Sequence, residues 1–146
     1  MRIAWLLTLA LMSQVPQDDP ILPSEDACEG HGTMDAQACL MDRIFDATEK
    51  LERYLTEIRR QIQESGNTFF RNARQDLAAL DEAQTAWTAY VEADCTAVYE
   101  HQEGTIRTQM SQTCELRHTQ RRTHDLWETY LQGSDSGLPE PEGPEK

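Results

Sequence analysis

Hydrophobic positions recur every three or four residues along three long stretches of the chain, which is the period of one face of an α-helix. The stripe of the first stretch consists of Met41, Ile44, Thr48, Leu51, Leu55, Ile58 and Ile62. Thr33 or Asp35 can cap the start of this helix, and Gly66 can end it in a left-handed turn. We therefore predict a first helix of roughly thirty residues, about 45 Å long.

The second stretch keeps the same spacing. Its stripe consists of Phe70, Ala73, Leu77, Leu80, Gln84, Trp87, Val91, Asp94 and Val98. Asn67 or Thr68 is the expected N-cap. The connection through Ser65, Gly66 and Asn67 is short, so the first two helices should fold back on each other in antiparallel fashion.

A third stretch runs from about Thr105 to Leu131, and Gly104 separates it from the second. No stretch of strand length alternates between polar and apolar residues. A parallel dimeric coiled coil is the alternative, and the short glycine-containing turns disfavour it. The pattern thus predicts an all-α helical bundle of three long antiparallel helices, a hairpin extended by a third helix.

The two ends of the chain differ in composition from the helical stretches. Residues 3–12 form an apolar run after Arg2, which has signal-peptide length and is too short to span a bilayer. Prolines follow at once and disfavour a buried helix there. We expect a signal peptide over residues 1–13 with its cleavage site left open, a flexible arm over 14–27, a folded domain over 28–132, and a disordered acidic, proline-rich tail over 133–146.

Four cysteines, an even number, suit an exported chain with two disulfides. Cys95 and Cys114 flank Gly104 at nearly equal distances, so an antiparallel turn there places them side by side. Such a bridge stabilises the fold by roughly 3 kcal/mol in the loop-entropy model. Cys28 would then pair with Cys39. The first hairpin also sets Cys39 opposite Cys95, so Cys39–Cys95 with Cys28–Cys114 stays open as an alternative.

The chain is strongly acidic. It carries 26 Asp and Glu against 13 Lys and Arg, for a formal net charge of −13 at pH 7. Loss of the first segment with Arg2 would take the charge to −14. This charge disfavours nucleic acid and anionic membranes as partners and favours a cationic partner, although solubility is the commoner reason for such a composition.

Three polar residues, Gln84, Asp94 and Arg117, occupy stripe positions. A buried carboxylate needs a donor, and Arg107 and Arg122 are the candidate partners of Asp94. An acid–base site is one interpretation. We favour a structural network that fixes the register of the helices, because no set of nucleophile, base and orienting group accompanies these residues.

No motif for catalysis or for a cofactor occurs in the chain. Phosphate-binding glycine loops and glycine-flanked nucleophilic serines are both missing from the sequence. Among the four histidines, His118 can share a helix face with Glu115, three residues earlier, but a helical metal motif needs more ligands than these two. We therefore predict a protein without catalytic residues, metal or cofactor, which is not an enzyme.

Two runs of residues resemble a known family. The first is AQTAWTAYVEADC, which ends at Cys95, and the second is Cys114-x4-Thr119-x2-Arg122-x3-Leu126. Together with the spacing of Cys28, Thr33-Met34, Cys39, Leu51-x-x-Tyr54 and Gly104-Thr105-Ile106, they resemble the LprI-like domain over residues 28–131. This small exported helical domain of bacteria is named after a mycobacterial lysozyme inhibitor. The family-motif residues are Leu51, Tyr54, Gln84, Trp87, Tyr90, Asp94, Gly104, Thr119, Arg122 and Leu126.

The chain departs from the family pattern at two positions. Glu52 stands where an Asn commonly follows the Leu, and Val91 stands where an Arg often follows the aromatic residue. Either change alters a surface or a network of side chains, so it bears on function more than on fold.

The resemblance implies an exported, periplasmic or secreted, disulfide-bonded and non-enzymatic protein that binds and inhibits lysozyme. Animal-type lysozymes are strongly basic, so an acidic partner would be steered toward them. Our first expectation for the partner-binding residues is Glu92, Glu100 and Glu103. Our second is the cluster Asp42, Asp46, Glu49 and Glu52. The alternative is a periplasmic structural or interaction module with another ligand, which would bind its partner without any effect on lysozyme.

Overall fold

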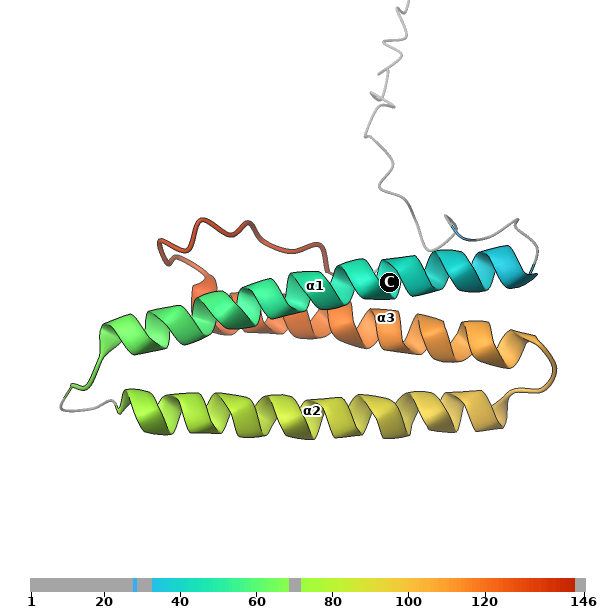
Figure 1. Cartoon of the computed structure of the whole chain (residues 1–146), viewed down its shortest axis with the longest axis horizontal. Coiled ribbons are helices and arrows are strands. Elements are labelled where there is room, and N and C mark those ends of the chain that lie inside the picture. Colours follow the sequence, from blue (N-terminus) through green and yellow to red (C-terminus); the bar gives the residue numbers. More distant parts are fainter. Residues whose placement is uncertain (1–27, 29–32, 69–71, 144–146) are drawn as a thin grey trace, which may run out of the picture.

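The computed structural model describes residues 28, 33–68 and 72–143, and within them the chain is all-α (Figure 1). Three long helices follow one another: α1 (Thr33–Ser65), α2 (Ala73–His101) and α3 (Ile106–Leu126). A five-residue π-helix, η2 (Trp127–Leu131), continues α3. No strand occurs in the described residues. The predicted fold class is confirmed.

The helices form an up–down–up arrangement in which α3 is the common partner. Figure 1 shows α2 running antiparallel to both α1 and α3. Both α1 and α2 pack more extensively on α3 than on each other. This leaves the two outer helices partly separated, so grooves can form between them above α3.

The main core lies where the second half of α1, the first half of α2 and the end of α3 meet. Its buried residues are Leu51, Tyr54, Leu55, Ile58, Ile62, Leu80, Leu126 and Leu131. Most of the predicted α1 stripe is therefore buried, because a repeat of three and four keeps these side chains on one face. Two residues of the stripe are exceptions: Met41 has 53 % of its surface exposed, and Thr48 is also exposed.

The start of α2 differs from the prediction. Its N-cap is Asn72, whose Oδ1 accepts the backbone N–H groups of Arg74 and Gln75 at 3.1 and 3.2 Å. Neither Asn67 nor Thr68 is the N-cap, although Asn67 Oδ1 accepts the N–H of Ala73 at 3.0 Å. Several polar side chains near the start of α2 can accept hydrogen bonds from its free N–H groups, so the sequence alone did not predict at which residue α2 begins. The expected stripe residue Phe70 lies outside the described residues.

The two predicted turns have the expected backbone. Gly66, after α1, has φ 60°, and Gly104, between α2 and α3, has φ 70°. These left-handed conformations favour glycine over any residue with a Cβ. The third helix extends to Leu131 as predicted, but its last turn is a π-helix, in which the N–H of Gln132 donates to the carbonyl of Trp127 at 2.8 Å.

The C-terminal segment, residues 133–143, packs back along α1, as Figure 1 shows in red. Leu138 packs against the main core and Pro141 is buried. The hydroxyl of Tyr54 donates to the carbonyl of Pro139 at 2.6 Å. Burial raises the pKa of Tyr54 above 10.0, with the charge of Arg53 opposing this, so the phenol stays a donor. The prediction of a disordered tail is therefore wrong for these residues, because the segment uses the surface of α1 rather than a core of its own.

The predicted signal peptide over 1–13 and the arm over 14–27 lie outside the described residues. Within the described part of the chain, none of the helices combines the length and the hydropathy that crossing a bilayer requires.

Candidate functional site

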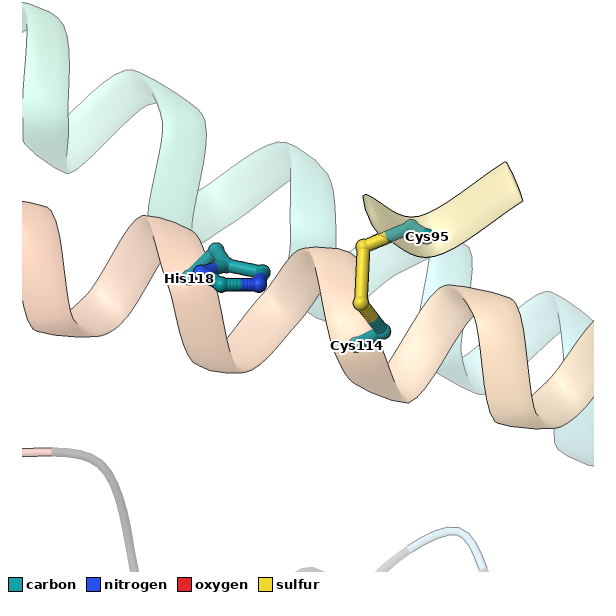
Figure 2. Close-up of side chains that lie close together, drawn as sticks. All are labelled: Cys95, Cys114 and His118. Atoms are coloured by element: carbon teal, nitrogen blue, oxygen red, sulfur yellow. A yellow bond between two sulfur atoms is a disulfide. The ribbon is translucent and has the colours of Figure 1, made fainter. Parts of the chain in front are cut away.

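Two disulfides join parts of the described chain, one between α2 and α3 and one near the start of α1. Cys95 of α2 is bonded to Cys114 of α3, with their Cα atoms 5.6 Å apart (Figure 2). Cys28 is bonded to Cys39 near the start of α1, with a Cα separation of 5.7 Å. This is the pairing that the turn at Gly104 favoured, and the alternative with Cys39–Cys95 is not the one formed.

The bridge between α2 and α3 fixes which residues face each other along these two helices. Residues before Cys95 lie opposite residues after Cys114, because the two helices are antiparallel. Asp94 accordingly faces His118, with 2.8 Å between Oδ2 and Nε2. The ring of Tyr90 meets the ring of His118 edge-on, with 5.4 Å between centroids.

The predicted arginine partners of Asp94 are wrong. Arg107 lies before Cys114 in α3 and therefore faces the end of α2, where its Nη2 donates to Glu100 at 3.3 Å. Its guanidinium also lies 3.7 Å above the ring centroid of Tyr99. Moreover, the Asp94 side chain is 42 % exposed, so its carboxylate is not a buried charge.

Arg122 acts further along the same contact between α2 and α3. Its Nε donates to Gln84 Oε1 at 3.2 Å, and its guanidinium lies 6.0 Å from the ring centroid of Trp87. Contacts between Gln84, Trp87, Tyr90 and Asp94 on α2 and His118 and Arg122 on α3 thus follow one another along the helices. We call this set the α2–α3 seam.

The remaining family-motif residues also support the fold. Leu51, Tyr54 and Leu126 lie in the main core. Thr119 is buried, and its hydroxyl donates to the carbonyl of Glu115 at 2.9 Å. Tyr90 differs from these buried motif residues, because 55 % of its surface is exposed. Most of the motif residues therefore contribute to the packing of the helices against one another.

His118 is the site residue that the sequence analysis missed as a partner. A signal was available, because His118 follows Cys114 by one helical turn while Asp94 immediately precedes Cys95. In Figure 2 the ring of His118 lies beside the disulfide, on the same helix as Cys114. The side chains of Cys95, Cys114 and His118 lie close enough together to suggest a metal site. Since the two sulfurs are bonded to each other, however, these residues offer no thiolate to a metal ion.

A second group of possible metal ligands lies at the end of α3. The ligand atoms of His124, Asp125 and Glu128 lie within 4.8 Å of one another. His124 Nε2 is also 3.5 Å from Glu140 Oε1 of the C-terminal segment. The carboxylates of Asp125 and Glu128 are exposed, so we interpret the group as a cluster of surface charges near the C-terminal segment.

All three helices contribute to a groove that is acidic at its rim. It has a volume of about 400 Å³ and runs between α1 and α2 with α3 beneath it. The exposed carboxylates of Glu52, Glu92 and Glu115 line it, one from each helix. None of the described residues that line it is basic. We call this feature the acidic groove.

Apolar side chains provide the inner surface of the acidic groove. Leu51 and Val91 are buried, and Trp87 is partly buried and packs against two hydrophobic clusters. Thr88 lines the groove from α2 and is exposed. The groove therefore combines three apolar side chains with three exposed carboxylates and several uncharged polar residues.

The three carboxylates of the groove are unpaired among the described residues, whereas several others are paired. Arg60 binds both Glu57 and Glu64, and Arg59 binds Asp81 at 3.0 Å. Hydrogen bonding to Arg60 holds the pKa of Glu57 at about 2, below its usual 4.5, with Gln61 assisting and burial opposing. The groove lacks such cations.

The predicted partner-binding residues lie in different parts of the structure. Glu92 lies in the acidic groove, but Glu100 is paired with Arg107 and Glu103 is exposed beyond the end of α2. From the second predicted set, Glu52 lines the groove, while the remaining three residues are exposed elsewhere on α1: Asp42, Asp46 and Glu49. Glu115 was not predicted, although its place beside Cys114 puts it near the bridge.

A larger cavity of about 960 Å³ lies at the other end of the bundle, near Cys28. Its lining is mostly apolar and includes Leu40, Val98 and Ile106. Asp94 and Arg117 contribute opposite charges, so the cavity favours neither anions nor cations. Arg117, predicted on a stripe, is exposed.

Comparison with known proteins supplies a family. A family model described as "Lysozyme inhibitor LprI" matches residues 24–126, which include all of α1, α2 and α3. No curated protein and no solved structure matches the chain. The match ends where η2 begins, so the C-terminal segment lies beyond it. On this match, which spans well over half of its length, the chain belongs to the lysozyme inhibitor LprI family.

Proposed function

We propose that this protein is an exported inhibitor that binds a basic lysozyme and carries out no reaction itself. The observation that carries the proposal is the family match across all three helices. The described residues add a fold held by disulfides and hydrophobic packing, which suits a rigid binding protein. A preorganised surface binds with a smaller loss of conformational entropy than a flexible one.

The charge of the chain supports a basic partner. A net charge of −13 on a chain of 146 residues attracts a strongly basic lysozyme at long range. Such attraction raises the association rate, and dissolved salt screens it. Bound at the mouth of the active-site cleft, an inhibitor of this size would exclude the cell-wall substrate.

Export fits the same proposal. Two disulfides persist in an oxidising compartment, such as the bacterial periplasm or the exterior. The apolar run over residues 3–12 has the length of a signal peptide. An inhibitor in either location would share a compartment with an incoming lysozyme.

A lysis assay tests the proposal. Purified oxidised protein, mixed with hen-type lysozyme in molar excess at low salt, should slow the clearing of a bacterial cell-wall suspension. Poly-glutamate at the same total charge serves as the control and should slow clearing much less, because charge alone lacks a complementary surface. Undiminished lysis at a clear molar excess would contradict inhibition of this enzyme. Binding without any loss of lysis would favour the interaction module instead.

A further inference from the structure

We infer that the acidic groove is the docking point and that it receives one lysine or arginine side chain of the protein partner. The inference rests on the proposed function, since it names the chemistry by which the partner is held. It concerns Glu52, Glu92 and Glu115 around the interior formed by Leu51, Trp87 and Val91.

The size of the groove suits a side chain rather than a whole element. Small-molecule pockets begin at about 300 Å³, and the acidic groove measures about 400 Å³. One long side chain projecting from a globular surface fits such a space. A helix or a strand would need a longer channel.

The lining matches the two halves of a basic side chain. Lysine and arginine place an apolar stem along hydrophobic surface while the charged end stays near water or near a counter-charge. Leu51, Val91 and the ring of Trp87 offer the apolar wall. The rim carboxylates offer the counter-charge. The Trp87 ring already has one guanidinium, that of Arg122, 6.0 Å from its centroid, which shows that a cation is tolerated beside it.

Electrostatic complementarity favours the acidic groove over Glu100, which was also predicted to bind the partner. Glu52, Glu92 and Glu115 have no basic partner among the described residues, so a cation that enters meets uncompensated negative charge. By contrast, Glu100 at the end of α2 is already bound by Arg107. Charge-assisted hydrogen bonds to carboxylates are among the stronger polar contacts at interfaces.

A matched pair of threonines on α2 provides the sharpest test. Thr88 and Thr85 are both exposed, and their hydroxyls donate to carbonyls four residues earlier, at 3.0 and 2.9 Å. Only Thr88 lines the groove. Thr88→Lys should weaken binding to hen-type lysozyme at least about thirtyfold, because its own ammonium would occupy the groove. Thr85→Lys changes the net charge equally and should weaken binding less than about threefold.

A second comparison removes the charge instead of filling the groove. The triple variant Glu52→Gln, Glu92→Gln and Glu115→Gln should weaken binding at least about tenfold more than a control triple with the same charge change. The control is Asp35→Asn, Glu82→Gln and Asp125→Asn, which also takes one exposed acid from each long helix and none from the groove. Circular dichroism should show all variants folded, because every substituted side chain is exposed.

The outcomes separate the inference from the function beneath it. If wild type binds and the groove variants lose no more affinity than their controls, the groove is not the docking point, yet lysozyme binding stands. If wild type shows no binding to hen-type lysozyme at low salt, the proposed function fails for this enzyme, and the inference fails with it. Selective loss in Thr88→Lys and in the groove triple would support both.

Discussion

Replacing Leu55 with alanine should lower the free energy of unfolding by about 3 kcal/mol, within the range of about 2–5 kcal/mol seen for buried leucines. Leu55 is 0 % exposed in the main core. Its truncation leaves a cavity, because helices joined by a disulfide and by core packing can collapse only partly into the space. Urea unfolding followed by helical circular dichroism measures the change as a shift of the midpoint.

Thr56→Ala is the matched control for this substitution. Thr56 is the next residue of α1 and is exposed, so its truncation removes no core contact. It should change stability by less than about 0.5 kcal/mol. Equal effects at the two positions would mean that α1 does not bury the face described here.

Removing the bridge between α2 and α3 should also cost about 3 kcal/mol in the loop-entropy model. The two cysteines are 19 residues apart in the sequence, and both are buried. In the double variant Cys95→Ala and Cys114→Ala the unfolded chain regains the freedom that the bridge removes. Chemical unfolding of the oxidised proteins should show the variant shifted to lower denaturant.

The same experiment in reductant separates the bridge from local packing. Reduced wild type also lacks the crosslink, so it should then unfold within about 1 kcal/mol of the reduced variant. A gap that remains at about 3 kcal/mol in reductant would show that the cysteine side chains, rather than the crosslink, stabilise the fold.

The periodicity predicted which face of each helix is buried, but it did not predict how far packing continues along the helix. The aliphatic residues of the stripe, Ile44, Leu51, Leu55, Ile58 and Ile62, are buried, whereas Thr48 is exposed. Met41 has the same spacing and remains exposed. A stripe states which side chains share a face, and only the position of the neighbouring helix decides which of them lose contact with water.

The polar contacts of the α2–α3 seam were predictable only once the cysteine pairing was fixed. With Cys95 opposite Cys114 in antiparallel helices, Asp94 falls within one helical turn of the position that faces His118, and Arg107 lies near Glu100. Attraction of opposite charges alone suggested arginine partners for Asp94 instead. Register, which the disulfide sets, decided between nearby donors.

The acidic groove and the C-terminal segment were beyond the reach of the sequence pattern. The groove gathers single exposed residues from three helices, and no local pattern links Glu52, Glu92 and Glu115. The segment contains one aliphatic residue, Leu138, and its order depends on the α1 surface around Tyr54. Both features arise from tertiary packing, on which composition gives no information.

The bridge and the acidic groove are physically connected. Ser111 lines the groove, and its hydroxyl donates to the carbonyl of Cys95 at 3.1 Å. Thr96, the next residue, also lines it. The crosslink that stabilises the fold therefore also joins two of the three helices that line the groove.

The dissociation constant for hen-type lysozyme, measured by titration calorimetry at two salt concentrations, tests the central claim most directly. An acidic surface that docks on a basic enzyme should bind at about 20 mM salt and lose at least about tenfold in affinity at about 300 mM, because salt screens exposed charges. No detectable binding at the lower concentration would contradict the account, as would an affinity that does not change with salt.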